Sequence, residues 1–317
     1  MLKYLARKIV LLVVMVMVIS FIIFFALNNT GVDPVMFTMS MDNYDPAVAE
    51  ALRESLGLND PLLVRYFRWI GDLVQGNFGF SIARGFAIRD GLLAKWPASL
   101  ELAVYALILS TVFGIGIGMM SAFWQNSFID YLGRGFAVLG NSMPSYFFAL
   151  ILIQIFAIRL GWLPTTGRIP AGTTTFLDRL PNLILPVLAL AIPMTGNLMR
   201  YTRNTMLDVA NQEYIKTARS KGISEISVYV KHIFRNSMRP VVTVLLFRLG
   251  ILVGGSVAVE TIFGWPGIGP VLTAAITASD YSVVMMSALI TAIMMLVISF
   301  LVDISTALLD PRVRYEA

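Results

Sequence analysis

Residues 213–222 read Glu-Tyr-Ile-Lys-Thr-Ala-Arg-Ser-Lys-Gly and lie in a basic segment, Arg200–Arg239, with a long apolar run on either side. Charged side chains are costly inside a bilayer, so this segment must project from it. Its residues predict a short amphipathic helix that ends at Gly222, because glycine readily takes the left-handed conformation of a helix end. The pattern favours docking to a partner rather than chemistry.

The composition indicates a membrane protein. Of the 317 residues, 57% are hydrophobic and only 14% are charged, whereas soluble domains carry about 25% charged residues. A bilayer core is crossed by about 20 apolar residues in a helix. We therefore predict an all-α integral membrane fold with six transmembrane helices, near Ile9–Leu27, Leu102–Ile129, Gly135–Ile158, Leu180–Met199, Pro240–Val259 and Tyr281–Val302.

The basic residues predict the orientation. With the N-terminus inside, the inner segments hold more Lys and Arg than the short outer loops, so both termini are expected in the cytoplasm. The net charge of +5 then reflects orientation and gives no reason to expect nucleic-acid binding. The first span is predicted to be a retained anchor, because its apolar run is longer than that of a signal peptide and no cleavage site follows.

The chain is predicted to form a single membrane domain over residues 1–317. It would comprise an anchor helix at 1–27, an extracytoplasmic segment at 28–99, and a five-helix core at 100–317 that contains the basic segment 200–239. After Pro61, apolar residues recur at helical spacing, which predicts an amphipathic helix lying on the membrane or on the other spans.

The sequence lacks the residues of several catalytic and binding sites. It contains no Gly-Lys pair, which excludes a phosphate-binding loop and ATP hydrolysis by this chain. It has one histidine and no cysteine, which argues against a zinc site. We predict a non-catalytic chain that binds no metal and no cofactor of its own.

The basic segment leaves two partners open. Tyr214, Ile215 and Ala218 are expected on one helical face, and a second helix from Ser224 is expected to place Ile226, Val230 and Ile233 together. Such a pair of basic helices suits an anionic lipid surface and suits a partner protein equally well.

Several stretches resemble a known family. Glu213–Gly222, with Thr217-Ala218 and Gly222 placed as in the Glu-Ala-Ala…Gly loop, resembles the coupling segment of ABC importer permeases. Glu260-Thr-Ile-Phe-Gly-Trp-Pro-Gly-Ile-Gly269 resembles the signature of the dipeptide/oligopeptide/nickel permeases, and the long segment after the first span resembles that of the B-type member of the permease pair. Further similar stretches are Ser99–Leu102, Leu160–Pro164 and Leu309–Arg314.

Two residues depart from the pattern. Lys216 replaces the glutamate of the general coupling motif, as is usual in this subfamily, and Arg248 stands where the subfamily often has an uncharged polar residue.

The resemblance implies a type I ABC importer permease in the inner (cytoplasmic) membrane of a prokaryote. It implies a second related permease, two ABC ATPase subunits that bind ATP and Mg, an extracytoplasmic solute-binding protein and surrounding lipid as partners. Peptides are the expected cargo, with nickel complexes, glutathione or oligosaccharides as alternatives. The coupling residues would be Glu213, Tyr214, Ile215, Thr217, Ala218, Arg219, Lys221 and Gly222.

The signature block is expected at the outer mouth of the pathway, where a structural turn is favoured over contact with the substrate. Trp265 is expected to be an anchor at the membrane interface, whereas Glu260 is either a buried hydrogen-bonding group or the wetted end of a helix. The residues concerned are Glu260, Thr261, Phe263, Trp265, Pro266, Gly267 and Gly269.

Arg248 is expected to face the protein interior or a water-filled pathway, because a cation facing lipid is costly. It would either contact a neighbouring span or line the translocation pathway and favour anionic groups. A secondary transporter is the rival class, but such proteins carry inverted repeats and several intramembrane charges. The sequence shows no repeat, and Arg248 is the one charge within the predicted spans.

Overall fold

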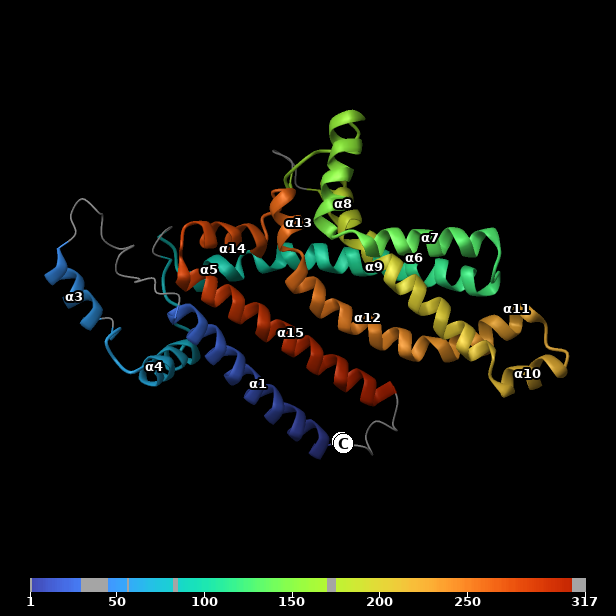
Figure 1. The fold of residues 1–317 in the computed structure, drawn as a ribbon, viewed down its shortest axis with the longest axis horizontal. Coiled ribbons are helices and arrows are strands. Elements are labelled where there is room, and N and C mark those ends of the chain that lie inside the picture. The colour runs from blue at the N-terminus through green and yellow to red at the C-terminus, as the bar shows by residue number, and fades with distance from the viewer. Residues whose placement is uncertain (1, 30–44, 56, 82–84, 170–174, 310–317) are drawn as a thin grey trace.

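The structure, a computed structural model, describes residues 2–29, 45–55, 57–81, 85–169 and 175–309. These residues are almost entirely helical (Figure 1), and the one extended pairing among them is an isolated bridge between Phe80 and Ala87. The prediction of an all-α fold is confirmed.

Four of the described helices are long and apolar enough to cross a membrane, and a bent pair raises the count to five. The predicted number of six is therefore not confirmed. The four helices are α1 (Leu2–Asn28), α6 (Trp96–Phe123), α9 (Phe176–Ala210) and α15 (Tyr281–Leu309). The bent pair consists of α7 (Phe128–Ser142) and α8 (Ser145–Leu152), which η2 (Ile153–Arg159) extends.

Two predicted spans are broken. The run Gly135–Ile158 bends by 104° between α7 and α8, where Met143 is extended (φ −122°, ψ 137°). The cause is Pro144, which disfavours the helical conformation in the residue before it. The run Pro240–Val259 is divided at Ser256 between α12 (Arg235–Gly255) and α13 (Val257–Ile262).

Helix α9 lies at the centre of the molecule, where it packs against α6, α7, α8 and α12 (Figure 1). It continues through Pro181, Pro186 and Pro193, because the neighbouring helices enclose the backbone that the prolines leave unpaired. At its far end the chain turns into α10 (Glu213–Ser220), α11 (Glu225–Ser227) and η3 (Val228–Phe234).

At the opposite end, α1 packs against α15 and is crossed by α4 (Leu62–Val74). The buried Tyr66 ties α4 to α1, since its hydroxyl lies 2.8 Å from the Ser20 hydroxyl and donates to the Met17 carbonyl at 3.0 Å. The amphipathic helix predicted after Pro61 is thus confirmed. The same end holds α3 (Pro46–Ser55), α5 (Ile88–Leu93) and α14 (Ile268–Thr277). The side of the membrane on which residues 28–99 lie stays a prediction.

Candidate functional site

Helix α10 covers Glu213–Ser220 and lies at an extremity of the molecule (Figure 1). Ile215 is fully buried and Ala218 nearly so, in a cluster with side chains of α6, α9 and η3. Gly222 ends the turn with φ +75°, a conformation that costs glycine little and other residues more. The apolar stripe of the predicted docking helix therefore fastens α10 to its own chain.

The exposed face of α10 is polar apart from one ring. Tyr214 is 47% exposed, so the expectation that it shares the face of Ile215 and Ala218 is wrong. Only Ile215 and Ala218 form the buried face of α10, and Tyr214 lies at the edge of that face. The remaining predicted coupling residues are exposed, and they are Glu213, Thr217, Arg219, Lys221 and Gly222.

Two ion pairs order this exposed surface. Lys216 Nζ lies 2.7 Å from Glu213 Oε1 within α10, and Arg219 Nε lies 2.8 Å from Glu225 Oε1 at the start of α11. Exposed pairs contribute little stability, and the second one links α10 to the start of α11.

The second helical stretch departs from the predicted face. Val228 and Ile233 are buried, whereas Ile226 and Val230 are 69% and 53% exposed. Residues 228–234 wind as a π-helix, whose wider turn changes which residues share a face. Burial raises the pKa of the Tyr229 hydroxyl, which donates to the Ala122 carbonyl at 3.3 Å.

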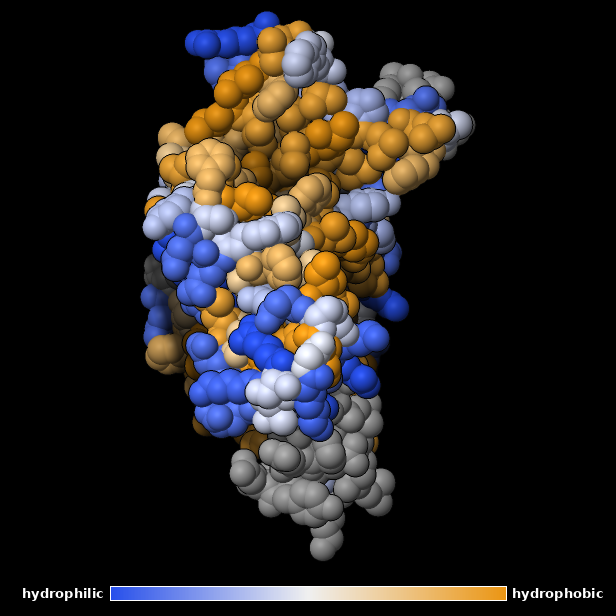
Figure 2. Space-filling view, turned by 90° about the vertical axis from the view of Figure 1, so that its right-hand side faces the viewer, coloured by the Kyte–Doolittle hydropathy of each residue, from blue (hydrophilic) through white to orange (hydrophobic). Residues whose placement is uncertain are grey.

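Figure 2 looks onto this end of the molecule. Hydrophilic residues gather at the height of α10 and α11, and hydrophobic surface lies above them at the height of α7 and α8. The exposed apolar residues there include Leu132, Leu139, Phe147 and Leu150. This distribution is the one expected if α10 and α11 project into water while α7 and α8 face lipid.

A buried ion pair joins the first turn of α7 to α9. Asp130 is fully buried and accepts from Arg203 Nε at 2.7 Å and from Nη2 at 2.8 Å. It also accepts from the Ser121 hydroxyl and from the Asn126 N–H at 2.9 Å. Sequence reasoning missed this pair, because its members are 73 residues apart and both read as loop charges. The nearest local signal is Ser127, which caps α7 at the N–H of Asp130.

The signature block folds around a buried carboxylate. Glu260 is 1% exposed, and its Oε1 accepts from the Ser256 hydroxyl at 2.6 Å while Oε2 accepts from the Gly269 N–H at 2.7 Å. A Cβ built on Gly267 would lie 2.3 Å from Glu260 Oε2, so only glycine fits there. This geometry supports the buried hydrogen-bonding role for Glu260 over the wetted helix end.

Trp265 is fully buried, and its indole N–H donates to the Ala98 carbonyl at 2.8 Å. The expectation that it anchors at the membrane interface is therefore wrong, because the Pro-Gly turn directs the ring inward onto α6. Phe263 is buried beside it, Pro266 is half-buried and Thr261 is exposed.

Motifs that are separate in the sequence meet at this block. Ser99 accepts from the Ile268 N–H at 2.9 Å, and the Gly167 N–H donates to the Phe263 carbonyl at 2.9 Å. Arg168 Nη2 lies 2.6 Å from Glu101 Oε2. The stretch Ser99–Leu102, the loop after Leu160–Pro164 and the signature block thus form one assembly opposite the α10 end. The stretch Leu309–Arg314 falls mostly outside the described residues.

Arg248 lines a cavity of about 260 Å³ at the bend between α7 and α8. Its Nε is buried and has no hydrogen-bond partner among the described residues. The other polar residues around the cavity are Asn141, Ser145 and Asn197, all uncharged. The contact with a neighbouring span that the sequence left open could have been an ion pair or a hydrogen bond to a carbonyl, and no ion pair of Arg248 occurs in the part of the chain described. The guanidinium of Arg248 is therefore a cation in this cavity that a carboxylate could contact.

No group of three or more metal-ligating side chains occurs in the described ranges. The prediction that this chain binds no metal and no cofactor stays a prediction.

Comparison with known proteins places these features in a family. Residues 114–315 match the model described as the inner membrane component of binding-protein-dependent transport systems, and residues 1–88 match its N-terminal counterpart. The oligopeptide transport system permease protein AppB of Bacillus subtilis (strain 168) is 37% identical over 98% of this chain and 99% of its own length.

The glutathione transport system permease protein GsiC of Escherichia coli (strain K12) is 33% identical over the full length of both chains. A solved amino acid ABC transporter chain, crystallised with histidines, superposes with a TM-score of 0.55 at 17% identity. It covers 68% of this chain and 92% of its own length, which shows a common fold.

Proposed function

This chain belongs to the inner membrane components of binding-protein-dependent transport systems, and from that premise we propose that it forms half of the membrane pathway of an ATP-driven peptide importer. The ABC permease fold and the family expected from the sequence are confirmed. The observation that carries the proposal is α10, a short helix whose apolar stripe is buried in a cluster with side chains of η3, α9 and α6, and whose other face is exposed. Peptide cargo is supported by the names of the relatives.

The family works with other components, and we propose which ones. A second related permease completes the pathway, two ABC ATPase subunits bind ATP and Mg, and a solute-binding protein delivers the peptide. The chain itself would be non-catalytic, since its sequence lacks a phosphate-binding loop. Glutathione stays the nearest alternative cargo. ATPase subunits should copurify with the chain, and a secondary transporter would lack them.

We propose that both termini lie in the cytoplasm. The natural sequence has no cysteine, so single introduced cysteines report cleanly. Ser224→Cys, beside α10, should react with an impermeant maleimide only from the cytoplasmic side, and Ser55→Cys, in α3, only from outside. Both positions are exposed. Labelling of the first from outside would reverse the topology.

Coupling would pass from the ATPase through α10 into α9. Because Ile215 and Ala218 are buried in a cluster that also contains Met206 of α9 and side chains of η3, a push on the exposed side of α10 would be passed to α9 through this cluster. The exposed Tyr214 is the side chain best placed to enter a pocket of the ATPase.

Tyr214 provides the sharpest test of this docking. Tyr214→Ala should reduce substrate-stimulated ATP hydrolysis and copurification of the ATPase about tenfold or more, as expected for a lost aromatic anchor. Tyr214→Phe is the matched control, which keeps the ring and should retain most activity. Wild-type coupling in Tyr214→Ala would refute docking through this face.

We propose that Arg248 lines the pathway and attracts the carboxylate of the passing peptide. The uncharged lining of its cavity supports this role. In the reconstituted complex, Arg248→Gln should slow transport of a carboxylate-bearing peptide more than that of its C-terminal amide, with basal ATP hydrolysis unchanged. Arg248→Lys should partly restore transport. Loss of assembly in both variants would instead make Arg248 structural.

A further inference from the structure

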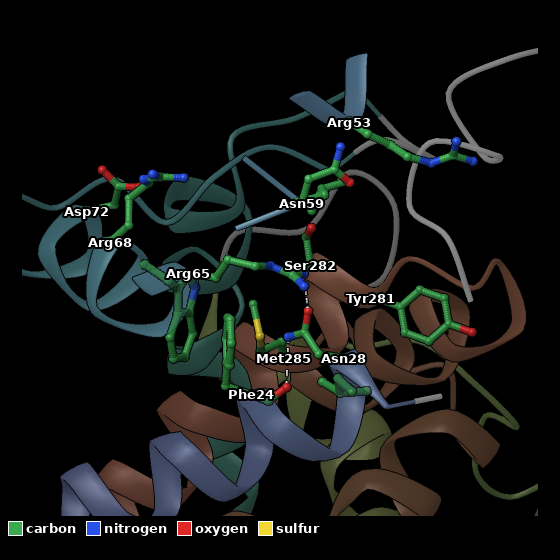
Figure 3. A pocket seen from close by; sticks show the side chains of 13 residues that line it. Phe24, Asn28, Arg53, Asn59, Arg65, Arg68, Asp72, Tyr281, Ser282 and Met285 are labelled. Carbon is green, nitrogen blue, oxygen red and sulfur yellow. Dashed lines mark hydrogen bonds between the residues drawn. The ribbon is translucent and has the colours of Figure 1, made fainter. Parts of the chain in front are cut away.

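A second cavity, of about 450 Å³, lies where α1, α4 and the start of α15 meet (Figure 3). It is far from α10, and the proposed transport mechanism does not use it. The apolar part of its lining comes from Phe24, Leu27, Trp69 and Met285. Because α1 ends and α15 begins here, the cavity lies where these spans leave the bilayer.

Its charged lining leaves one cation without a carboxylate. Arg53 pairs with Glu50 at 2.9 Å and Arg68 with Asp60 at 2.7 Å. Arg65 Nη2 donates to the Asn28 side-chain carbonyl, and no ion pair forms to it within the described ranges. A guanidinium has five N–H donors, so Arg65 keeps donors for an anion. Figure 3 shows its guanidinium beside Asn28.

The same lining carries a carboxylate, that of Asp72. Its side chain forms neither a hydrogen bond nor an ion pair among the residues that the structure describes. The cavity thus combines an anion-binding and a cation-binding group, and Trp69 and Tyr281 also line it. This arrangement suits a ligand that carries both a phosphate and an ammonium group.

Helix α4 adds an apolar flank outside the cavity, formed by side chains that do not line it. Leu63, Val64 and Phe67 are 57%, 47% and 60% exposed, although the adjacent Tyr66, whose ring centroid lies 5.3 Å from that of Phe67, is buried against α1. Tyr66 reaches Ser20, well inside the first span, so the exposed face of α4 lies at the level of the acyl chains. A ligand with a charged head and an apolar tail would use both surfaces.

We propose that this cavity binds the headgroup of a zwitterionic phospholipid with a primary ammonium group, as in phosphatidylethanolamine. Arg65 contacts the phosphate, Asp72 accepts from the ammonium, and the acyl chains lie along the exposed face of α4. An acidic side chain of a docked protein would satisfy Arg65 alone. It would leave Asp72 and the apolar flank unexplained.

The test is lipid binding to the delipidated, purified transporter complex, measured by native mass spectrometry with added synthetic lipids. The wild-type complex should retain phosphatidylethanolamine in preference to phosphatidylglycerol and phosphatidylcholine of the same acyl chains. Arg65→Gln should weaken binding of phosphatidylethanolamine about tenfold, as expected when a hydrogen bond to a charged group is lost. Asp72→Asn should abolish the preference over phosphatidylglycerol and spare phosphatidylglycerol itself.

Arg89→Gln and Asp90→Asn are the matched controls, because both residues are exposed on neighbouring α5 and neither lines the cavity. They should bind lipid as the wild type does. Phosphoethanolamine, the headgroup without acyl chains, should compete at least tenfold less well than the lipid. If phosphoethanolamine competed as well as the lipid, the cavity would bind a free phosphate compound, and the proposal of a lipid ligand would be overturned.

Two further results would overturn the proposal. One is a wild-type complex with no preference among the three lipids, a measurement that holds even if a variant fails to assemble. The other is an Arg65→Gln complex with unchanged lipid binding but weakened association with the solute-binding protein, which would make the cavity a protein-docking site.

Discussion

The buried pair of Asp130 and Arg203 predicts a large loss of stability on removal of one partner. Asp130→Asn keeps the shape of the side chain, but removes the charge that faces a guanidinium whose side chain is only 11% exposed. One amide N–H then points at the donors of Arg203. Removal of one member of a buried ion pair costs about 3–5 kcal/mol, because the other charge stays buried and unpaired.

The loss should be measured as the apparent free energy of unfolding of the purified chain in a denaturant titration. Asp130→Asn should lower it by about 3–5 kcal/mol, and Asp130→Asn combined with Arg203→Met should recover much of that loss, since the buried guanidinium is then removed and only the half-exposed Arg134, 3.6 Å from Asp130, loses its carboxylate. Glu225→Gln, which breaks the exposed pair with Arg219, is the control and should cost at most about 1 kcal/mol.

Two results would refute this reasoning. If Asp130→Asn and the control were equally mild, the pair would be solvated in the assembled protein. If the double variant were no more stable than Asp130→Asn, the hydrogen bonds of Asp130 to Ser121 and Asn126 would matter more than its charge.

Three other changes test separate parts of the fold. Gly267→Ala should lower the thermal stability of the complex, because its Cβ would lie 2.3 Å from the buried carboxylate of the signature block, whereas Gly71→Ala, with no atom within 4 Å of its Cβ, should not. Lys8→Asp should loosen α1 from α15, and adding Asp303→Lys should restore the 2.6 Å pair and the unfolding midpoint. Gly222→Ala should lower the free energy of unfolding by about 1–2 kcal/mol, because the backbone φ of +75° at this position is unfavourable for a residue with a Cβ. An unchanged free energy of unfolding would contradict this strain.

The parts of the fold that local signals specify could be predicted. The bounds of α10 and the left-handed turn at Gly222 follow from residues within ten positions of one another, and the helix after Pro61 follows from its apolar period. The family resemblance rested on the signature block, whose sequence is specific over ten consecutive residues.

What could not be predicted depends on contacts between distant residues. The Asp130–Arg203 pair, the inward turn of Trp265 and the meeting of the signature block with α6 all join segments far apart in sequence. The bend before Pro144 is different, because the proline itself was a local signal, but it lay inside an uncharged run that hydropathy alone predicted to be one continuous span. In the α11–η3 stretch, a helical period of 3.6 predicted the wrong face because the chain winds more widely there.

The length of α9 has a mechanical consequence. Its 35 residues span about 52 Å at 1.5 Å per residue, which exceeds the thickness of the hydrocarbon core. Near one end, the Asn182 amide is held by the Thr166 and Gly167 carbonyls, and the other end leads into α10. A tilt of α9 by about 5° about the Asn182 end would displace the end at α10 by about 4 Å. A small rotation of α9 beside the signature block and a large displacement of α10 would therefore be one motion.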